Sequence, residues 1–214
     1  MTQEAKLRDQ LAVLAKSLFD RGFSVGSSGN ISAGLDDGIL ITPTNSCLGF
    51  LDPARISKLD RTGRHIGGDA PSKEVFLHQA FYETRPETGA VVHLHSTYAT
   101  TLSCLSDVDE EDAVPSLTPY VVMRVGTVKR LPYVRPGDPK MGDLIRALGG
   151  QYAAVLLANH GPVVSAKDVE TAAYASEELE ETAKLVLLLR GEKARQLTRE
   201  QIDELIRVFQ APKS

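Results

Sequence analysis

The feature of this chain that most limits its fold is the alternation of short apolar runs with segments of helical periodicity. Several of the short runs are separated by turns alone, which is typical of antiparallel strands. A doubly wound parallel sheet needs a helical crossover between strands, and no G-x-G-x-x-G motif follows a predicted strand. The pattern therefore predicts an α/β fold, as an α/β/α sandwich with a central, largely antiparallel sheet.

The chain of 214 residues contains no internal repeat and no linker long enough to separate two domains, so we expect a single domain over residues 1–214. Ser72 is expected to cap the helix that starts at Lys73, and Pro86 to end it. Helices are predicted at 7–21, 73–84, 98–105, 139–148, 168–190 and 199–209, and strands at 38–42, 56–59, 90–95, 120–125, 127–131 and 153–158.

Composition excludes several classes of protein. The formal charge is −4, from 24 basic and 28 acidic residues, and no basic stripe suggests a nucleic-acid partner. Cys47 and Cys104 are the two cysteines, without a C-x-x-C motif, which favours a reducing compartment. The charged N-terminal segment lacks the apolar core of a signal peptide, and no apolar run approaches the roughly 20 residues of a membrane span. We therefore expect a soluble, cytoplasmic protein without a membrane partner.

Three of the five histidines lie on or just after predicted strands. His93 and His95 are two residues apart, so strand alternation places both imidazoles on one face. His160 lies in a turn after the strand predicted at 153–158. Three imidazoles and an open position make a catalytic zinc site. Paired histidines on a strand are also common as partly buried, hydrogen-bonded residues, and the pattern alone leaves both interpretations open.

The other polar signals also have two interpretations. Glu74 lies near the start of a predicted helix, where an acid complements the helix dipole, or it lies beside a metal and carries a proton. The loops at 28–30 and 42–45 are either simple turns or donors of N–H and hydroxyl groups to a phosphate. His65, in a polar loop, and His78, within a helix, are expected to have structural roles.

Five motifs occur in an order typical of one family. From about residue 5 to 210, the chain resembles the class II aldolase/adducin-head family, which includes fuculose-phosphate aldolase and ribulose-phosphate epimerase. The motifs are Ser28-Gly29-Asn30, Thr42-Pro43-Thr44, Pro71-Ser72-Lys73-Glu74, His93-Leu94-His95-Ser96 and Asn159-His160-Gly161. Further segments at 46–49, 94–97, 102–105, 118–124 and 135–138 are similar to members that decarboxylate a phosphorylated four-carbon 3-oxo acid.

The resemblance implies roles for individual residues. His93, His95 and His160 would bind Zn²⁺, or another divalent metal such as Mn²⁺ or Co²⁺. Glu74 would be an acid/base group that also reaches the metal, and Tyr120 would be a proton donor. The positions expected to bind the substrate and its phosphate are Gly29, Asn30, Thr44, Asn45, Ser72 and Lys73.

The chain departs from the aldolases of the family at three places. Lys73 stands where serine is common, Asn45 stands where glycine is common, and the tail at 207–214 lacks the aldolase-type tyrosine. Each departure weighs against an aldol reaction and leaves the metal site intact. Lys73 is expected to offset the carboxylate of the substrate, although an exposed lysine that only contacts solvent is an alternative.

The implied activity is that of a carbon–carbon lyase, a metal-dependent decarboxylase that forms dihydroxyacetone phosphate and CO₂ through an enediolate. Loss of CO₂ leaves an electron pair on C2 that delocalises onto the C3 oxygen, where a Lewis acid stabilises it. A class II sugar-phosphate aldolase or epimerase on the same site is the alternative, followed by a non-catalytic adducin-like interaction domain. The resemblance also implies a homotetramer with the active site at a subunit interface, and a small phosphorylated sugar acid as substrate.

Overall fold

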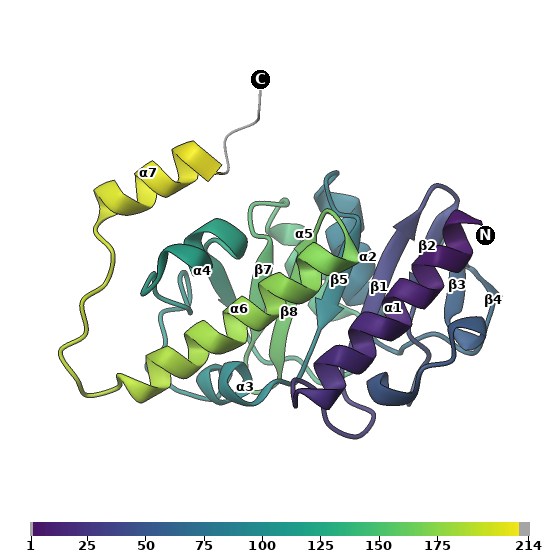
Figure 1. Ribbon diagram of the computed structural model, residues 1–214, viewed down its shortest axis with the longest axis horizontal. Helices are drawn as coiled ribbons and strands as arrows, with labels where there is room; N and C mark the ends of the chain where they lie inside the picture. Colours follow the sequence, from purple (N-terminus) through teal and green to yellow (C-terminus); the bar gives the residue numbers. More distant parts are fainter. Residues whose placement is uncertain (1, 210–214) are drawn as a thin grey trace.

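A single eight-stranded sheet runs through the molecule in the order β4-β3-β2-β1-β5-β8-β7-β6. The computed structural model, which describes residues 2–209, is shown in Figure 1. Every neighbouring pair is antiparallel except β6 and β7, which are parallel. The sheet is therefore mixed and mostly antiparallel, and the expected α/β class is confirmed.

The strands are β1 Asn30–Leu35, β2 Gly38–Ile41, β3 Ser57–Asp60, β4 His65–Gly67, β5 Ala90–His93, β6 Val128–Leu131, β7 Ala154–Leu157 and β8 Gly161–Ala166. The α-helices are α1 Gln3–Asp20, α2 Val75–Thr84, α3 Thr97–Ser103, α4 Pro119–Arg124, α5 Lys140–Ala147, α6 Val169–Leu188 and α7 Arg199–Phe209. Two short 3₁₀ helices, η1 Leu48–Phe50 and η2 Pro53–Arg55, join β2 to β3. Among the described residues, no helix is long and apolar enough to cross a membrane.

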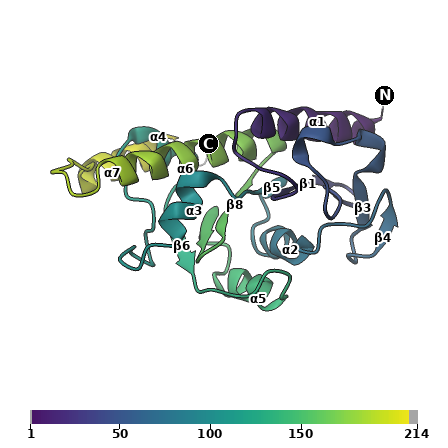
Figure 2. The same ribbon diagram turned by 90° about the horizontal axis from the view of Figure 1, so that it is seen from below.

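Helices pack on both faces of the sheet, as Figure 2 shows. On β7, Ala154 and Leu156 join a cluster that includes α3, α4 and α6. The alternate residues Val155 and Leu157 join another cluster with α2 and α5. Since successive strand side chains point to opposite faces, α4 and α2 lie on opposite sides of the sheet.

Two predictions about local structure are wrong. The segment 120–125, predicted as a strand, is helix α4, because Thr118 caps it at Val121 N and Pro119 occupies its first turn. Helix-start signals of this kind outweigh the β preference of the adjacent valines. Ser72 is not a helix N-cap. The N-cap position belongs to Glu74, and the Ser72 hydroxyl accepts a hydrogen bond from Glu74 N instead.

Three strands were not predicted, namely β1, β4 and β8. The strand β8 follows β7 through the turn at Asn159 and His160, where Asn159 has a φ of 55°. This left-handed conformation, which asparagine tolerates better than most residues, reverses the chain. The remaining predicted helices and strands are confirmed, with ends that differ by a few residues.

Candidate metal centre

Four ligating side chains converge at one end of β5. The Nε2 atom of His95 lies 3.2 Å from His93 Nε2 and 3.0 Å from His160 Nε2. The two carboxylate oxygens of Glu74 lie 3.5 Å from His93 Nε2 and from His160 Nε2. One ligating atom from each residue lies within 4.8 Å of the other three. The structure thus brings together all the residues that the sequence predicted as metal ligands.

The pairing of β5 with β8 places these residues. His93 ends β5 opposite Val163 of β8, so the turn that carries His160 lies beside the same strand end. The strand ends at His93, and His95 reaches the cluster from the connection to α3. Glu74 reaches it from the start of α2. Strand alternation therefore accounts for the direction of His93, while the direction of His95 depends on the connection that follows.

The histidines are held in a form that can bind a cation. His93 is fully buried, and its Nδ1–H donates to Pro162 O at 2.9 Å, which leaves the Nε2 lone pair facing the cluster. Burial lowers the pKa of His93 well below its usual value, and it also lowers the pKa of His95 and of His160. Neutral imidazoles are the ligating form of histidine.

The donor set fits a divalent metal. Three nitrogens around a tetrahedral zinc, each at roughly 2.0–2.1 Å, lie about 3.3 Å from one another. Two of the three Nε2 separations, 3.0 and 3.2 Å, are close to that value. Nitrogen with one carboxylate is a ligand set suited to Zn²⁺ and its neighbours in the first transition row. This cluster therefore has the residues to bind a divalent metal.

Close backbone packing holds the histidine strand in place. Gly29 has a φ of +81°, and a Cβ there would lie 2.9 Å from the carbonyl oxygen of His93. A Cβ on Gly161 would lie 2.3 Å from the carbonyl oxygen of Leu94. Both glycines permit the turns on either side of β5 to approach it closely.

The residues predicted to bind phosphate lie on three loops near this strand end. Ser72 is buried, Asn45 and Lys73 are exposed, and Thr44 is half-buried. A bridge between Pro43 and Pro71, together with the Thr44 N to Ala70 O hydrogen bond of 2.9 Å, joins the second loop to the third.

Asn30 already has hydrogen-bonding partners. Its amide nitrogen donates to Glu74 Oε2 at 2.9 Å, and its amide oxygen lies 2.5 Å from His78 Nε2. One N–H of the Asn30 amide therefore stays free of these two contacts.

Tyr120 lies apart from the cluster within one chain. It belongs to α4, which packs against α6 and α7 on the face opposite α2. Its side chain is 54% exposed, and the Arg124 guanidinium lies 5.3 Å from the ring centre.

Two groups of residues that the predicted site did not include lie beside the cluster or contact its neighbours. The segment 134–138 lines a small cavity together with Glu74 and His160, and its Arg135-Pro136-Gly137-Asp138 motif is the signal that marks it. His78 is fully buried and contacts Asn30. The four-residue spacing from Glu74 to His78 is a signal that both lie on one side of α2. His65 lies exposed in β4 and not in a loop.

The fold and the cluster define a metal-dependent class of enzyme, and comparison with known proteins gives the family. The chain belongs to the Class II Aldolase and Adducin N-terminal domain family, which it matches over residues 9–187. It is 52% identical over 206 residues to the 3-oxo-tetronate 4-phosphate decarboxylase of Pectobacterium atrosepticum, covering 96% of this chain and 94% of that protein. The L-fuculose phosphate aldolase of Haemophilus influenzae is 31% identical over 209 residues, covering 96% of this chain and 94% of that protein.

Solved structures agree with this assignment. The crystal structure of YgbL from Escherichia coli superposes with a TM-score of 0.93 at 47% identity, covering 95% of this chain and 99% of that one. An L-fuculose 1-phosphate aldolase superposes with a TM-score of 0.88 at 25% identity, covering 98% of each chain.

Proposed function

We propose that the chain is a metal-dependent 3-oxo-tetronate 4-phosphate decarboxylase that forms dihydroxyacetone phosphate and CO₂. The observation that carries the proposal is the convergence of His93, His95 and His160 with Glu74. Relatives at about 50% identity over nearly the whole chain have this activity as their name. The aldolase relatives, at 31–34% identity, are less similar, so an aldolase or epimerase activity is the second candidate.

The three histidines and Glu74 would hold Zn²⁺, with Mn²⁺ or Co²⁺ as alternatives. When bound, the metal supplies a Lewis acid for the negative charge that develops on the substrate oxygens. The protein holds the imidazoles neutral by burial and fixes the direction of His93 through Pro162. These features organise the ligands before the substrate arrives.

Contacts to the phosphate, which is remote from the reacting carbons, would hold those carbons in position. We assign the phosphate to the three loops, through Gly29, Thr44, Asn45 and Ser72 together with the free N–H of Asn30. The backbone N–H groups of Thr44 and Ser72 already donate to Ala70 O and Thr42 O, so these two residues would bind the phosphate through their hydroxyl groups.

Two cations are candidates for binding the substrate carboxylate. Lys73 is exposed and directly precedes Glu74 in the sequence. Arg135 lines the same cavity as Glu74 and His160, and its nearest carboxylate, on Asp138, is 3.9 Å away. The net charge of the protein is −4 and the substrate is anionic, so local cations are needed to bind it.

Decarboxylation requires one proton at C2. The C1–C2 bond breaks, CO₂ leaves, and the electron pair passes from C2 towards the C3 oxygen to form an enediolate. Protonation of C2 by Glu74 or Tyr120 then gives dihydroxyacetone phosphate. Glu74 lies at the cluster in the same chain, whereas Tyr120 would act in the site of a neighbouring subunit.

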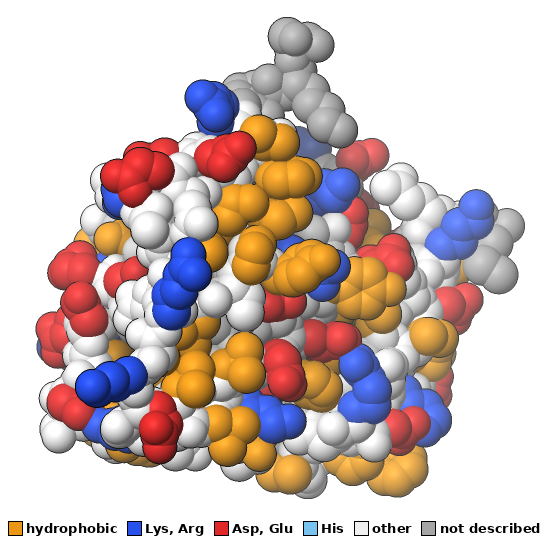
Figure 3. Space-filling model, turned by 60° about the vertical axis from the view of Figure 1, so that its left-hand side comes forward, with side chains coloured by type: hydrophobic (Ala, Val, Ile, Leu, Met, Phe, Trp, Pro, Cys, Tyr) orange, Lys and Arg blue, Asp and Glu red, His pale blue; other side chains and the backbone are white. Residues whose placement is uncertain are grey.

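A homotetramer with its site at a subunit interface accommodates the position of Tyr120. Figure 3, seen from the side of α4 and α7, shows hydrophobic side chains gathered among charged ones. Tyr120, Leu188 and Ile206 are exposed, as are Val208 and Phe209. Exposed apolar side chains that gather in this way mark interaction surfaces. This supports contact between subunits on that side of the chain.

We also propose that the whole chain is one domain. The helices on both faces of the sheet support its description as an α/β/α sandwich. The free thiols of Cys47 and Cys104 suit a cytoplasmic location.

The experiment that tests the proposed function follows the products. Purified protein is incubated with 3-oxo-tetronate 4-phosphate, and CO₂ and dihydroxyacetone phosphate are measured together. We expect equal amounts of the two. Release of an aldehyde from a sugar phosphate, without CO₂ from the keto acid, would instead identify an aldolase.

A further inference from the structure

A chain of hydrogen bonds runs from Glu74 into the interior between α2 and β1. The amide nitrogen of Asn30 donates to Glu74 Oε2 at 2.9 Å, and the amide oxygen of Asn30 lies 2.5 Å from His78 Nε2. On the other side of the imidazole, His78 Nδ1 lies 2.8 Å from Ser32 Oγ. Ser32 Oγ lies 3.0 Å from the Tyr82 hydroxyl.

The spacing of these residues in the two elements explains the contact. Glu74, His78 and Tyr82 are four residues apart on one side of α2, and Asn30 and Ser32 are two apart on one face of β1. Four residues advance a helix by about 6 Å and two residues advance a strand by about 6.6 Å. The helix and strand therefore keep their polar side chains in register, and the chain of contacts continues for two helical turns.

The donors and acceptors allow one direction along the chain. The Asn30 oxygen can only accept, so His78 donates from Nε2 and its Nδ1 is an acceptor. Ser32 then donates to His78 Nδ1, and its oxygen accepts from Tyr82. Burial raises the pKa of the Tyr82 phenol, so its hydroxyl keeps the proton that it donates. Every hydrogen bond therefore points towards the Glu74 carboxylate.

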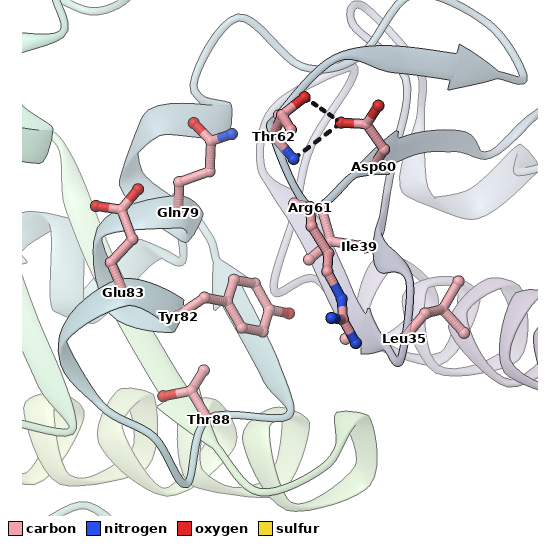
Figure 4. A pocket seen from close by; sticks show the side chains of 12 residues that line it. Leu35, Ile39, Asp60, Arg61, Thr62, Gln79, Tyr82, Glu83 and Thr88 are labelled. Carbon is pink, nitrogen blue, oxygen red and sulfur yellow. Dashed lines mark hydrogen bonds between the residues drawn. The ribbon is translucent and has the colours of Figure 1, made fainter.

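Tyr82, the last residue of this hydrogen-bond chain, lies in the wall of a separate cavity. This cavity, of about 390 Å³, is bordered by Tyr82 and by residues of β1, β2 and the β3–β4 turn. Figure 4 shows the Tyr82 ring extending from α2 across the cavity wall. Asn30, Ser32 and His78 are at most 4% exposed, so water does not replace these contacts.

We propose that His78, Ser32 and Tyr82 are positioning residues that orient the amide of Asn30 and, through it, the carboxylate of Glu74. The inference rests on the proposed function for the role of Glu74. If the Asn30 amide were flipped, its oxygen would lie against Glu74 Oε2, and two acceptors would face each other. The Nε2–H form of His78 prevents that flip, because its Nε2–H needs an acceptor and only the oxygen of the Asn30 amide can accept.

The first test does not depend on activity. Nitrogen NMR of the histidine side chains distinguishes imidazole protonated at Nε2 from imidazole protonated at Nδ1. We expect His78 of the wild-type protein to carry its proton on Nε2, and Ser32→Ala to alter the Nδ1 signal. A proton on Nδ1 of His78 would overturn the proposal, whether or not the protein decarboxylates the keto acid.

The second test compares kinetic constants. We expect His78→Leu to lower kcat at least tenfold, with KM changed less than twofold and metal content unchanged. His78→Gln, which supplies an N–H to Asn30, is expected to recover part of the loss. Ser32→Ala is expected to lower kcat about threefold, and it remains informative if His78→Leu does not fold.

Phe81→Leu is the matched control, because Phe81 is fully buried on the same helix and has no polar atom in the chain. At a comparable loss in Tm, we expect this control to keep kcat within twofold of wild type. Equal losses of kcat in Phe81→Leu and His78→Leu would show a purely structural role and overturn the proposal. A wild-type protein that releases no CO₂ would overturn the proposed function, while the NMR measurement would still decide the hydrogen-bond direction.

Discussion

The Nε2 atoms of His95 and His160 lie 3.0 Å apart although 65 residues separate them in the sequence. His95 Nε2 also lies 3.2 Å from His93 Nε2, and a single N–H on His95 could serve only one of these two neighbouring nitrogens. A shared cation would give all three Nε2 lone pairs a partner. The close approach of these nitrogens is therefore the best structural evidence for a metal site.

Removal of one histidine is expected to remove the metal and the activity together. Wild-type protein should carry about one divalent metal per chain, and His95→Ala should carry none and lose turnover. Elemental analysis and CO₂ release measure the two effects on the same preparation. Full activity in metal-free wild-type protein would contradict this prediction.

Glu74→Gln is expected to separate metal binding from catalysis. The three histidines should retain the metal, while loss of the carboxylate should lower kcat by about 10²–10⁴-fold, as for other general acid–base groups. Metal content and kcat are measured in parallel with wild type. Turnover at the wild-type rate would remove Glu74 from the mechanism.

Lys73→Ser and Arg135→Gln test recognition of the substrate carboxylate. The substrate has this carboxylate and dihydroxyacetone phosphate lacks it. Each substitution should therefore weaken kcat/KM for the keto acid, by about tenfold or more for loss of a charge-assisted contact. Inhibition by dihydroxyacetone phosphate should change little. A variant that weakens both ligands equally would place its residue at the phosphate instead.

Lys73→Ser has a second expected effect, on reaction choice. It should harm decarboxylation more than the cleavage of an aldol substrate such as fuculose 1-phosphate, because serine is common at this position in the aldolases that the chain resembles. The ratio of the two rates measures this effect. Equal losses would exclude Lys73 from the specificity of the site.

The stability of the metal-free protein should fall as the pH is lowered from about 6.5 towards 3. Burial lowers the pKa of His78 to about 3, so within this range the unfolded chain binds a proton that the folded chain does not. The free energy of unfolding should decrease by up to about 1.4 kcal/mol per pH unit on this account. His78→Gln should show a shallower slope by that amount in denaturant titrations with chelator, and parallel slopes for the two proteins would contradict it.

Mixed oligomers test the position of Tyr120. His95→Ala should be inactive as a pure protein, and Tyr120→Phe should be nearly inactive if Tyr120, rather than Glu74, protonates C2. If Tyr120 acts in a neighbouring subunit, co-assembled mixtures should regain part of the activity, because some sites then have both residues. Activity no greater than the sum of the separate proteins would place Tyr120 outside the neighbouring site.

The convergence of His93, His95, His160 and Glu74 could be predicted from the sequence because these residues are carried by short motifs with a recognisable order. The α/β fold class could also be predicted from the sequence, since apolar runs such as the one in β7 are typical of buried strands. The strand β8 was missed because it starts with Gly161 and Pro162, which favour turns in isolation. It forms because β5 and β7 supply pairing partners on both sides.

Two other differences have local causes. The valines of α4 favour a strand, but the cap at Thr118 and the packing of Val121 and Val122 against α6 decide the conformation. The contact of His78 with Asn30 depends on the packing of α2 beside β1. The spacing of residues within one helix or strand does not reveal this packing. Long-range contacts of this kind become visible only when the elements are placed in space.

The turn between β7 and β8 has a consequence for how the protein matures. His160 comes late in the chain. During synthesis, His93 and His95 therefore cannot complete the three-histidine ligand set until the β7–β8 hairpin has emerged and β8 has paired with β5. A metal bound by these histidines would link the end of β5 to the turn before β8, so its binding would favour the fully folded chain.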